Sequence, residues 1–544
     1  MNALISGSVW PLAGLVWPLL LALVPALPRW RARAPWLLPL APLPALGFAL
    51  AGAPGTAVLP DLLLGVELAA VPGGALLLGM TAVVWVVAGW HAALTLEPGP
   101  RAGILSGFWC LALAGNLGVF LAADIVTFYL AFATVSLAAW ALVVHDRTPA
   151  ALAAGRFYIL LAVIGEAALL AGLLIGASAA QDLSIATLRE TLPDAPFGQL
   201  AMVMLVLGFG IKAGMVPLHQ WLPLAHPVAP VPGSAVLSGA IVKAGLIGVI
   251  LFLPAQGGVA AVLLAAGLFG AFAAAARGLF VTSPKTVLAY STVSQMGLLL
   301  ALFGAGSGAL AYYATHHGLA KAALFLSVGV LAGARTKGQR RATLAVAGLA
   351  ALSVAGLPLL GGALAKLGAK PGLGDAMTLA VTLTGVTTTL ILAWFLTLLA
   401  RSAPKPEAAP WPPLFAGLAL LVALALILPW ALWPGQTALP LAYPLGLANL
   451  LDGLWPVLIG LALLPLLLRL PPGDHPPADP LDRARMLAAR LPARRPRRTA
   501  RPLYRLLLRR LARLRAAESG LAHWPLSGGL MIALMLALAI GLRP

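Results

Sequence analysis

The sequence predicts an all-α integral membrane protein, and composition, long apolar runs and the absence of strand-like alternation lead to that fold class. Of the 544 residues, 61% are hydrophobic and only 9% are charged, which is far from the balance of soluble domains. Apolar runs of about twenty residues recur along the chain, and each could cross roughly 30 Å of hydrocarbon as a helix. The run at 415–430 shows no barrel-type alternation. Helices are therefore the expected spanning structures.

The apolar runs predict about sixteen transmembrane helices. The first part of the chain contains predicted spans near 3–27, 35–53, 74–96, 102–121, 124–145, 150–177, 198–224, 231–253, 258–281 and 286–304. The second part contains predicted spans near 308–333, 342–368, 374–400, 411–434, 446–470 and 522–542. The first span has neither a basic leading region nor a clear cleavage site, so we expect a mature helix there and not a signal peptide.

The distribution of charge between the loops predicts how the chain is oriented. Loops after odd-numbered spans carry the basic residues Arg29, Arg31, Arg33, Arg147, Arg277, Lys285, Arg335, Lys337, Arg340, Arg341, Arg401 and Lys405. Loops after even-numbered spans are nearly uncharged or carry Asp61, Glu67, Asp182 and Asp194. Because cytoplasmic loops collect arginine and lysine, we expect a multi-pass protein of a bacterial-type inner membrane with its N-terminus outside.

Residues 471–520 differ in character from the rest of the chain. A proline-rich stretch at 471–480 precedes a strongly basic one, in which Leu503, Leu507, Leu511 and Leu514 form a helical stripe among arginines. This pattern is typical of an amphipathic helix that lies against anionic lipid, here on the cytoplasmic side; docking on a partner subunit is the alternative. The net charge of +19 is thereby explained by the membrane, and no nucleic acid partner is expected.

Cysteine and histidine usage argues against a cofactor. Cys110 is the only cysteine, which excludes intrachain disulfides, CxxC zinc sites and cysteine-ligated iron–sulfur clusters. The histidines form neither an HExxH motif nor a haem attachment motif. We therefore expect no cofactor and no metal, and electron transfer would occur in another subunit.

Lysines inside the apolar spans carry the predicted chemistry. Lys212, Lys243, Lys321 and Lys366 lie within spans or at their interrupted ends, where a charge costs about 3 kcal/mol even on insertion scales. A buried lysine can release its proton, whereas arginine stays protonated. The lysines therefore predict a proton relay; snorkelling to the interface or a structural pair with a carboxylate are the alternatives.

Prolines and glycines predict that two of the spans are broken. Pro217, Pro223, Pro227, Pro230 and Pro232 interrupt the region of the seventh span. A second interruption, GLPLLGG at 356–362, comes just before Lys366. Each break frees backbone groups at membrane depth, where they are tolerated beside a hydrated site.

Three stretches in order resemble one family. They are GIKAGMVPLHQWLPLAHPVAPVPGSAVLSGAIVKAGLIG (210–248), SPKTVLAYSTVSQMG (283–297) and HGLAKAALFLSVG (317–329). They resemble the hallmarks of the antiporter-like, proton-conducting subunits of complex I, Mrp antiporters and group 4 membrane-bound hydrogenases, over roughly residues 60–430. The resemblance implies two inverted five-helix repeats, each with a broken helix. The expected segments are terminal helices (1–101), two half-channel repeats (102–253 and 254–400), C-terminal helices (401–470), the basic segment (471–520) and an anchor (521–544).

The resemblance also implies roles for single residues. Lys212 and Lys243 match the lysines of the seventh and eighth helices, His317 and Lys321 match the central relay, and Lys366 matches the exit lysine. His317 stands four residues before Lys321, and so shares its helix face. His219 and His226 match motif histidines beside the channel, although a packing role is as plausible for them.

One position departs from the family pattern. The family carries a glutamate nine residues after the aspartate that is Asp124 here, but this chain has Ala133. Glu166, in the sixth span, is the only acidic residue within a central span, and a lone intramembrane carboxylate is usually paired. We hypothesise that Glu166 supplies the missing carboxylate to Lys212; the alternative is a protonated or snorkelling carboxyl.

These observations predict a proton-translocating subunit with no redox centre of its own. It would count as part of an oxidoreductase only within a complex I-like assembly. Its partners would be other membrane subunits, protons and anionic lipid. Sodium/proton exchange of the Mrp kind is an alternative, as is a role in inorganic carbon uptake with a soluble partner. A quinone reductase would need cofactor ligands that the sequence lacks.

Overall fold

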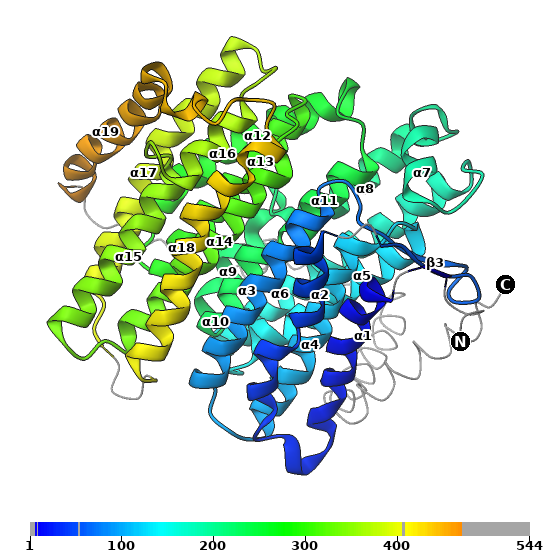
Figure 1. Ribbon diagram of the computed structural model, residues 1–544, viewed down its shortest axis with the longest axis horizontal. Coiled ribbons are helices and arrows are strands. Elements are labelled where there is room, and N and C mark those ends of the chain that lie inside the picture. Colours follow the sequence, from blue (N-terminus) through cyan, green and yellow to red (C-terminus); the bar gives the residue numbers. More distant parts are fainter. Residues whose placement is uncertain (1–5, 8, 53–54, 405–408, 470–544) are drawn as a thin grey trace, which may run out of the picture.

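The computed structural model describes residues 6–7, 9–52, 55–404 and 409–469 (Figure 1). Its helices lie side by side, with α17 and α19 at the left in this view, α9, α10 and α12 to α14 in the middle, and α1, α7 and α8 at the right. The predicted basic segment (471–520) and the predicted anchor (521–544) lie outside the described residues. So does the predicted span at 522–542.

Helices make up nearly all of the described structure. In chain order they are α1 (Trp10–Leu23), α2 (Leu43–Ala51), α3 (Gly74–Thr95), α4 (Pro100–Leu121), α5 (Ile125–Val144), α6 (Pro149–Ala177), α7 (Ile185–Thr191), α8 (Gly198–Ala213), α9 (Trp221–Val228), α10 (Val231–Val236), α11 (Lys243–Phe252), α12 (Gly257–Gly278), α13 (Pro284–Gly304), α14 (Leu310–Ala332), α15 (Lys337–Ala355), α16 (Gly361–Ala369), α17 (Asp375–Arg401), α18 (Trp411–Gln436) and α19 (Leu447–Arg469). A small antiparallel sheet has the order β1 (Ser6–Gly7), β2 (Ala57–Leu59) and β3 (Val66–Leu68).

Within the described residues, twelve helices are long and apolar enough to cross a membrane. The predicted span at 3–27 contains only a shorter apolar helix, Trp10–Ala26. The predicted span at 308–333 is α14, whose polar residues His316, His317 and Lys321 reduce its hydropathy. The predicted span at 342–368 is divided between α15 and α16. The protein is a multi-pass membrane protein whose described membrane-spanning elements are helices, and the count of about sixteen spans stays a prediction.

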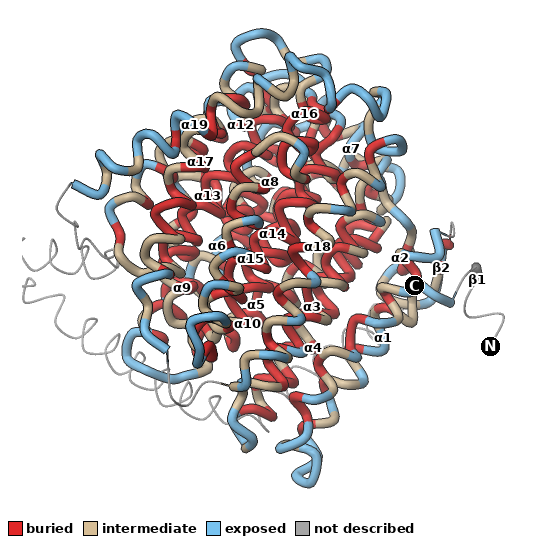
Figure 2. The backbone as a smooth tube through the Cα atoms, turned by 60° about the vertical axis from the view of Figure 1, so that its left-hand side comes forward, coloured by how far each residue is buried: buried red, intermediate tan, exposed pale blue. Residues whose placement is uncertain are grey.

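The most buried helices lie at the centre of the bundle. In the most apolar 18-residue stretch of the segment Val231–Phe252, and in that of helix α13, 94% of the residues are buried. The corresponding share in α19 is 17%. Figure 2 shows the buried backbone in the middle of the molecule and the exposed backbone concentrated in the connecting loops and terminal turns. Polar side chains within α11, α13 and α14 are therefore largely shielded from solvent.

Left-handed glycines end the helices at both predicted breaks. Helix α8 ends at Gly214 (φ +76°), where the Met215 N–H bonds the Gly210 carbonyl. Helix α15 ends at Gly356 (φ +97°), where the Leu357 N–H bonds the Leu352 carbonyl. This is the capping geometry that glycine adopts without a steric penalty. The chain then re-enters the bundle as the short helices α9 and α16.

Asp124 has a structural role at the start of α5. Its Oδ1 accepts a hydrogen bond from the Thr127 N–H (2.7 Å), and its Oδ2 accepts one from the Glu67 N–H (2.9 Å). Asp124 therefore caps α5 and ties it to strand β3.

Candidate site: a row of buried amines

The four predicted lysines are all buried, with side chains at most 7% exposed. Three of them adjoin irregular helix geometry. Lys212 lies in the last turn of α8, and Lys366 lies in α16 just after the second break. Lys243 is the first residue of α11 and follows the π-helical segment η6 (Leu237–Ile241); Lys321 lies within α14.

Lys212 and Glu166 line the same pocket. The Lys212 ammonium lies 5.5 Å from the centre of the Phe132 ring and 6.0 Å from that of Tyr158, within range of cation–π attraction. Glu166 is 7% exposed, and its Oε2 has no hydrogen-bond partner. In the described part of the chain, Glu166 and Lys212 form no direct ion pair. The structure therefore brings the two together across a pocket.

Lys243, His317 and Lys321 form the centre of the row. The Lys243 amine donates to the Ser238 carbonyl (2.6 Å) and the Lys321 amine to the Leu288 carbonyl (2.9 Å). His317 is 1% exposed, is close enough to interact electrostatically with both lysines, and has no partner for either ring nitrogen. Because a buried polar atom is nearly always hydrogen-bonded, these ring nitrogens are suited to a transient partner such as water.

Two hydrogen bonds link α14, α13 and α17 between the centre of the row and the Lys366 pocket. Tyr313, one turn before His317 on α14, donates its hydroxyl hydrogen to Gln295 Oε1 (2.8 Å). Gln295 Nε2 donates in turn to Thr388 Oγ1 (2.9 Å) on α17. Gly385, one turn earlier on α17, lines the pocket of Lys366. Sequence reasoning missed these polar residues, although each is a polar side chain within an apolar span.

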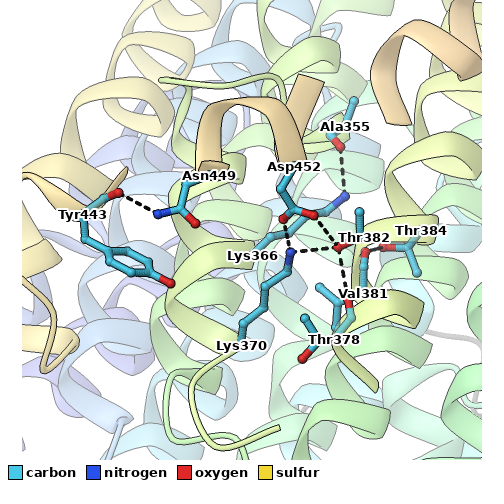
Figure 3. Close-up of polar contacts among 10 residues, drawn as sticks. All are labelled: Ala355, Lys366, Lys370, Thr378, Val381, Thr382, Thr384, Tyr443, Asn449 and Asp452. Carbon is cyan, nitrogen blue, oxygen red and sulfur yellow. Dashed lines mark hydrogen bonds and ion pairs between the residues drawn. The ribbon is translucent and has the colours of Figure 1, made fainter. Parts of the chain in front are cut away.

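Figure 3 shows the pocket at the Lys366 end of the row. The Lys366 amine donates to the Ala355 carbonyl (2.8 Å), which the end of α15 leaves free. The pocket has a volume of about 20 Å³, which is enough for about one water molecule. Lys370, Thr382 and Asp452 also line it. Lys370 forms an ion pair with Asp452 and donates to Thr382 Oγ1 (2.8 Å).

His316 connects the central row to the second break. Its Nε2 lies 2.8 Å from Ser353 Oγ on α15, and the Gly362 N–H of α16 donates to the same hydroxyl oxygen (3.3 Å). Sequence reasoning assigned no role to His316. Its hydrogen bond holds α14 against both sides of the α15–α16 break.

The two motif histidines are buried near the first break. His219 is 8% exposed, and its ring centre lies 6.3 Å from that of Tyr290. His226 is fully buried, stacks on Phe325 at 4.4 Å, and has no partner for either ring nitrogen. The Lys321 ammonium lies 5.9 Å from the same Phe325 ring. His226 is therefore packed beside the centre of the row.

A large polar cavity of about 960 Å³ opens at one end of the bundle, next to the first break. Its walls include residues 227–232, which follow His226, and the charged or titratable residues His91, Glu97, Arg101, His145, Asp146 and Lys285. His145 follows the last residue of α5, and burial lowers its pKa although nearby Asp146 opposes that effect. The cavity therefore gathers several titratable side chains beside the first break.

The fold and the buried amines define an antiporter-like, multi-pass membrane subunit. The family model described as "NADH:quinone oxidoreductase/Mrp antiporter, TM" matches residues 122–392, the part that contains all four buried lysines. This matched part of the chain belongs to the family of antiporter-like membrane subunits.

Two curated relatives show how far the similarity extends. Hydrogenase-4 component B of Escherichia coli (strain K12) is 28% identical over 43% of this chain and 38% of its own length. Na(+)/H(+) antiporter subunit A1 of Staphylococcus aureus (strain JH9) is 29% identical over 48% of this chain and 37% of its own length. The chain thus matches less than two fifths of the length of these relatives.

Solved structures show the same fold. A chain of the Mrp complex from Dietzia sp. DQ12-45-1b superposes with a TM-score of 0.73 at 24% identity, over 94% of this chain and 63% of that chain. A chain of respiratory complex I from Thermus thermophilus gives a TM-score of 0.62 at 21% identity, over 79% of this chain and 99% of that chain.

Proposed function

We propose that the chain translocates protons across the membrane as one subunit of a multi-subunit complex. Protons would pass along Lys212, Lys243, His317, Lys321 and Lys366. The burial of all four amines carries this proposal, because a charge inside the bilayer is costly and usually marks a transport path.

The central amines are bonded in a way that suits proton transfer. Lys243 and Lys321 donate to main-chain carbonyls. Because a carbonyl carries no net charge, it does not neutralise a positive charge on either amine. In a low dielectric, a proton on one amine disfavours a proton on its neighbour. His317 lies within electrostatic range of both and could pass a proton between them through water.

Two places along the row suit entry and exit. The polar cavity of about 960 Å³ beside His226 would admit protons from the cytoplasmic side, and the Lys366 pocket would release them on the other. We assign the two half-channels to residues 102–253 and 254–400. This assignment agrees with the helix breaks after Ala213 and Ala355. We also propose that the protein lies in an inner membrane with its N-terminus outside.

The complex to which the chain belongs would supply the driving force. One relative is named as a hydrogenase component and another as a subunit of a Na(+)/H(+) antiporter. Sodium/proton exchange is a second candidate function, favoured by that antiporter relative and by the fold match to an Mrp complex.

The proposal is tested by proton transport in inverted membrane vesicles from a strain that lacks the chain. We expect expression of the chain to restore acidification of the vesicle lumen, measured with a ΔpH-sensitive dye. Repeating the assay with and without sodium distinguishes the two candidate functions. Equal acidification with and without the chain would contradict both.

Glutamine in place of Glu166 is expected to reduce proton transport about tenfold, which corresponds to roughly 1.4 kcal/mol. The reason is that Lys212 would lose the carboxylate that shares its pocket. Glu190→Gln, at an exposed position near the end of α7, is the matched control. Wild-type transport rates in the Glu166 variant would exclude a role for this carboxylate.

A further inference from the structure

The Lys366 pocket contains two amines but only one carboxylate. Lys366 lies on α16, and Lys370, four residues later, directly follows the last residue of that helix; both line the pocket. Asp452 comes from α19, far away in sequence. If both amines were protonated and no carboxylate were present, they would repel each other.

Asp452 contacts Lys370 but not Lys366. Its Oδ2 accepts from the Lys370 amine, and its Oδ1 accepts from Thr382 Oγ1 (3.3 Å). The Lys366 amine is bonded to the Ala355 carbonyl instead. The side chains of Lys370 and Asp452 are 14% and 36% exposed, so the ion pair is more accessible to solvent than Lys366; Figure 3 shows its contacts. Asp452 therefore forms no hydrogen bond with Lys366 and acts on it through charge, both its own and that of the Lys370 amine that it holds.

The surroundings of Lys366 contain few other charges. His316 of α14 is near enough to interact electrostatically, and its Nε2 is bonded to Ser353. The neighbouring parts of α15 and α17 contribute the Ala355 carbonyl, Thr382 and Gly385 to the pocket, and the sequence of α18 contains no charged residue. In the described structure, Asp452 is thus the only carboxylate lining the pocket.

We propose that Asp452 is a positioning residue for proton release at Lys366, because it holds Lys370 and neutralises its charge. This inference rests on the proposed proton transport. With the ion pair formed, Lys366 is the only uncompensated amine in the pocket and can accept a proton from the row. With the carboxylate removed, the Lys370 ammonium disfavours a second ammonium at Lys366.

Asp452 also lies outside the residues that match the family, which end at 392. Helix α19 packs on α17 but is mostly exposed, with Leu458, Leu461 and Leu466 among its uncovered side chains. A mostly exposed helix, α19, therefore supplies the carboxylate that acts on proton release at the buried Lys366. Any displacement of α19 from α16 would change the charge beside Lys366.

The test measures proton transport by the full chain in inverted vesicles from its native membrane, per unit of chain detected by immunoblot. We expect Asp452→Asn to reduce transport about tenfold at neutral pH and to shift its pH dependence towards acid by about one unit, since loading Lys366 then requires more protons. Asp452→Glu should keep most of the transport. The double variant Lys370→Met with Asp452→Asn should recover at least half of it, because both charges are gone.

The double variant separates this role from simple anchoring of α19, since an anchor would be lost in both variants. Equal losses in the single and double variants, or wild-type transport in Asp452→Asn, would overturn the inference. Asp375→Asn, at an exposed position at the start of α17, is the matched control. Lys366→Met distinguishes the two proposals: if it transports normally, proton transfer through Lys366 fails, and the role of Asp452 fails with it. If it is inactive while Asp452→Asn is normal, only the role of Asp452 fails.

Discussion

Methionine in place of Lys212 or Lys366 is expected to abolish proton transport while the chain stays in the membrane at normal abundance. Methionine has a similar length and an apolar body that fits a buried site, but it has no group that can carry a proton. Both lysines line pockets at the ends of the row, so loss of either would interrupt the path. Transport should fall to the level of vesicles without the chain, measured by dye quenching.

The matched control for these substitutions is Lys337→Met, because Lys337 is exposed at the start of α15. It should transport like the wild type. Retention of normal transport in either the Lys212 or the Lys366 variant would remove that amine from the mechanism.

Valine in place of Gly362 is expected to destabilise the second break and to abolish transport as a consequence. A Cβ atom at Gly362 would lie 1.8 Å from the Ser353 carbonyl oxygen and 2.9 Å from His316 Cε1. Helices α15 and α16 would have to separate, because backbone cannot move aside as a flexible side chain can. Overpacking of this kind costs about 1–3 kcal/mol or more. The thermal midpoint of the purified protein in detergent should fall clearly.

Gly348→Val on α15 provides the control, since a Cβ atom there would meet nothing within 4 Å. Its thermal midpoint should stay close to that of the wild type. The same midpoint for Gly362→Val and for the wild type would show that α15 and α16 do not pack as closely as the structure has them.

Much of the fold could be predicted from the sequence, because lipid imposes simple requirements on a chain. Long apolar runs had to form helices, and the prolines between Pro217 and Pro232 had to interrupt them; the structure has helices and breaks at these places. The predicted span at 308–333 was harder to judge by hydropathy, because the same polar residues that suggest function reduce it.

The site was only partly predictable for a physical reason. The lysines were recognisable because a charge within an apolar run is unusual. The partners of these residues were not, because the contacts are tertiary: Asp452 meets Lys370 across 82 positions of sequence, and Gln295 meets Thr388 across 93. No periodicity or local motif encodes such pairings. The cavity beside His226 likewise depends on the ends of several helices.

The central claim is that the buried amines exchange protons through a hydrated line across the bundle, and an experimental density map that resolves ordered water tests it most directly. We expect water molecules to link Lys212, Lys243, His317, Lys321 and Lys366, with the unpartnered His317 nitrogens among their contacts. A map in which dry apolar packing separates these side chains, or in which the amines point outwards to the headgroups, would contradict proton transfer along this row.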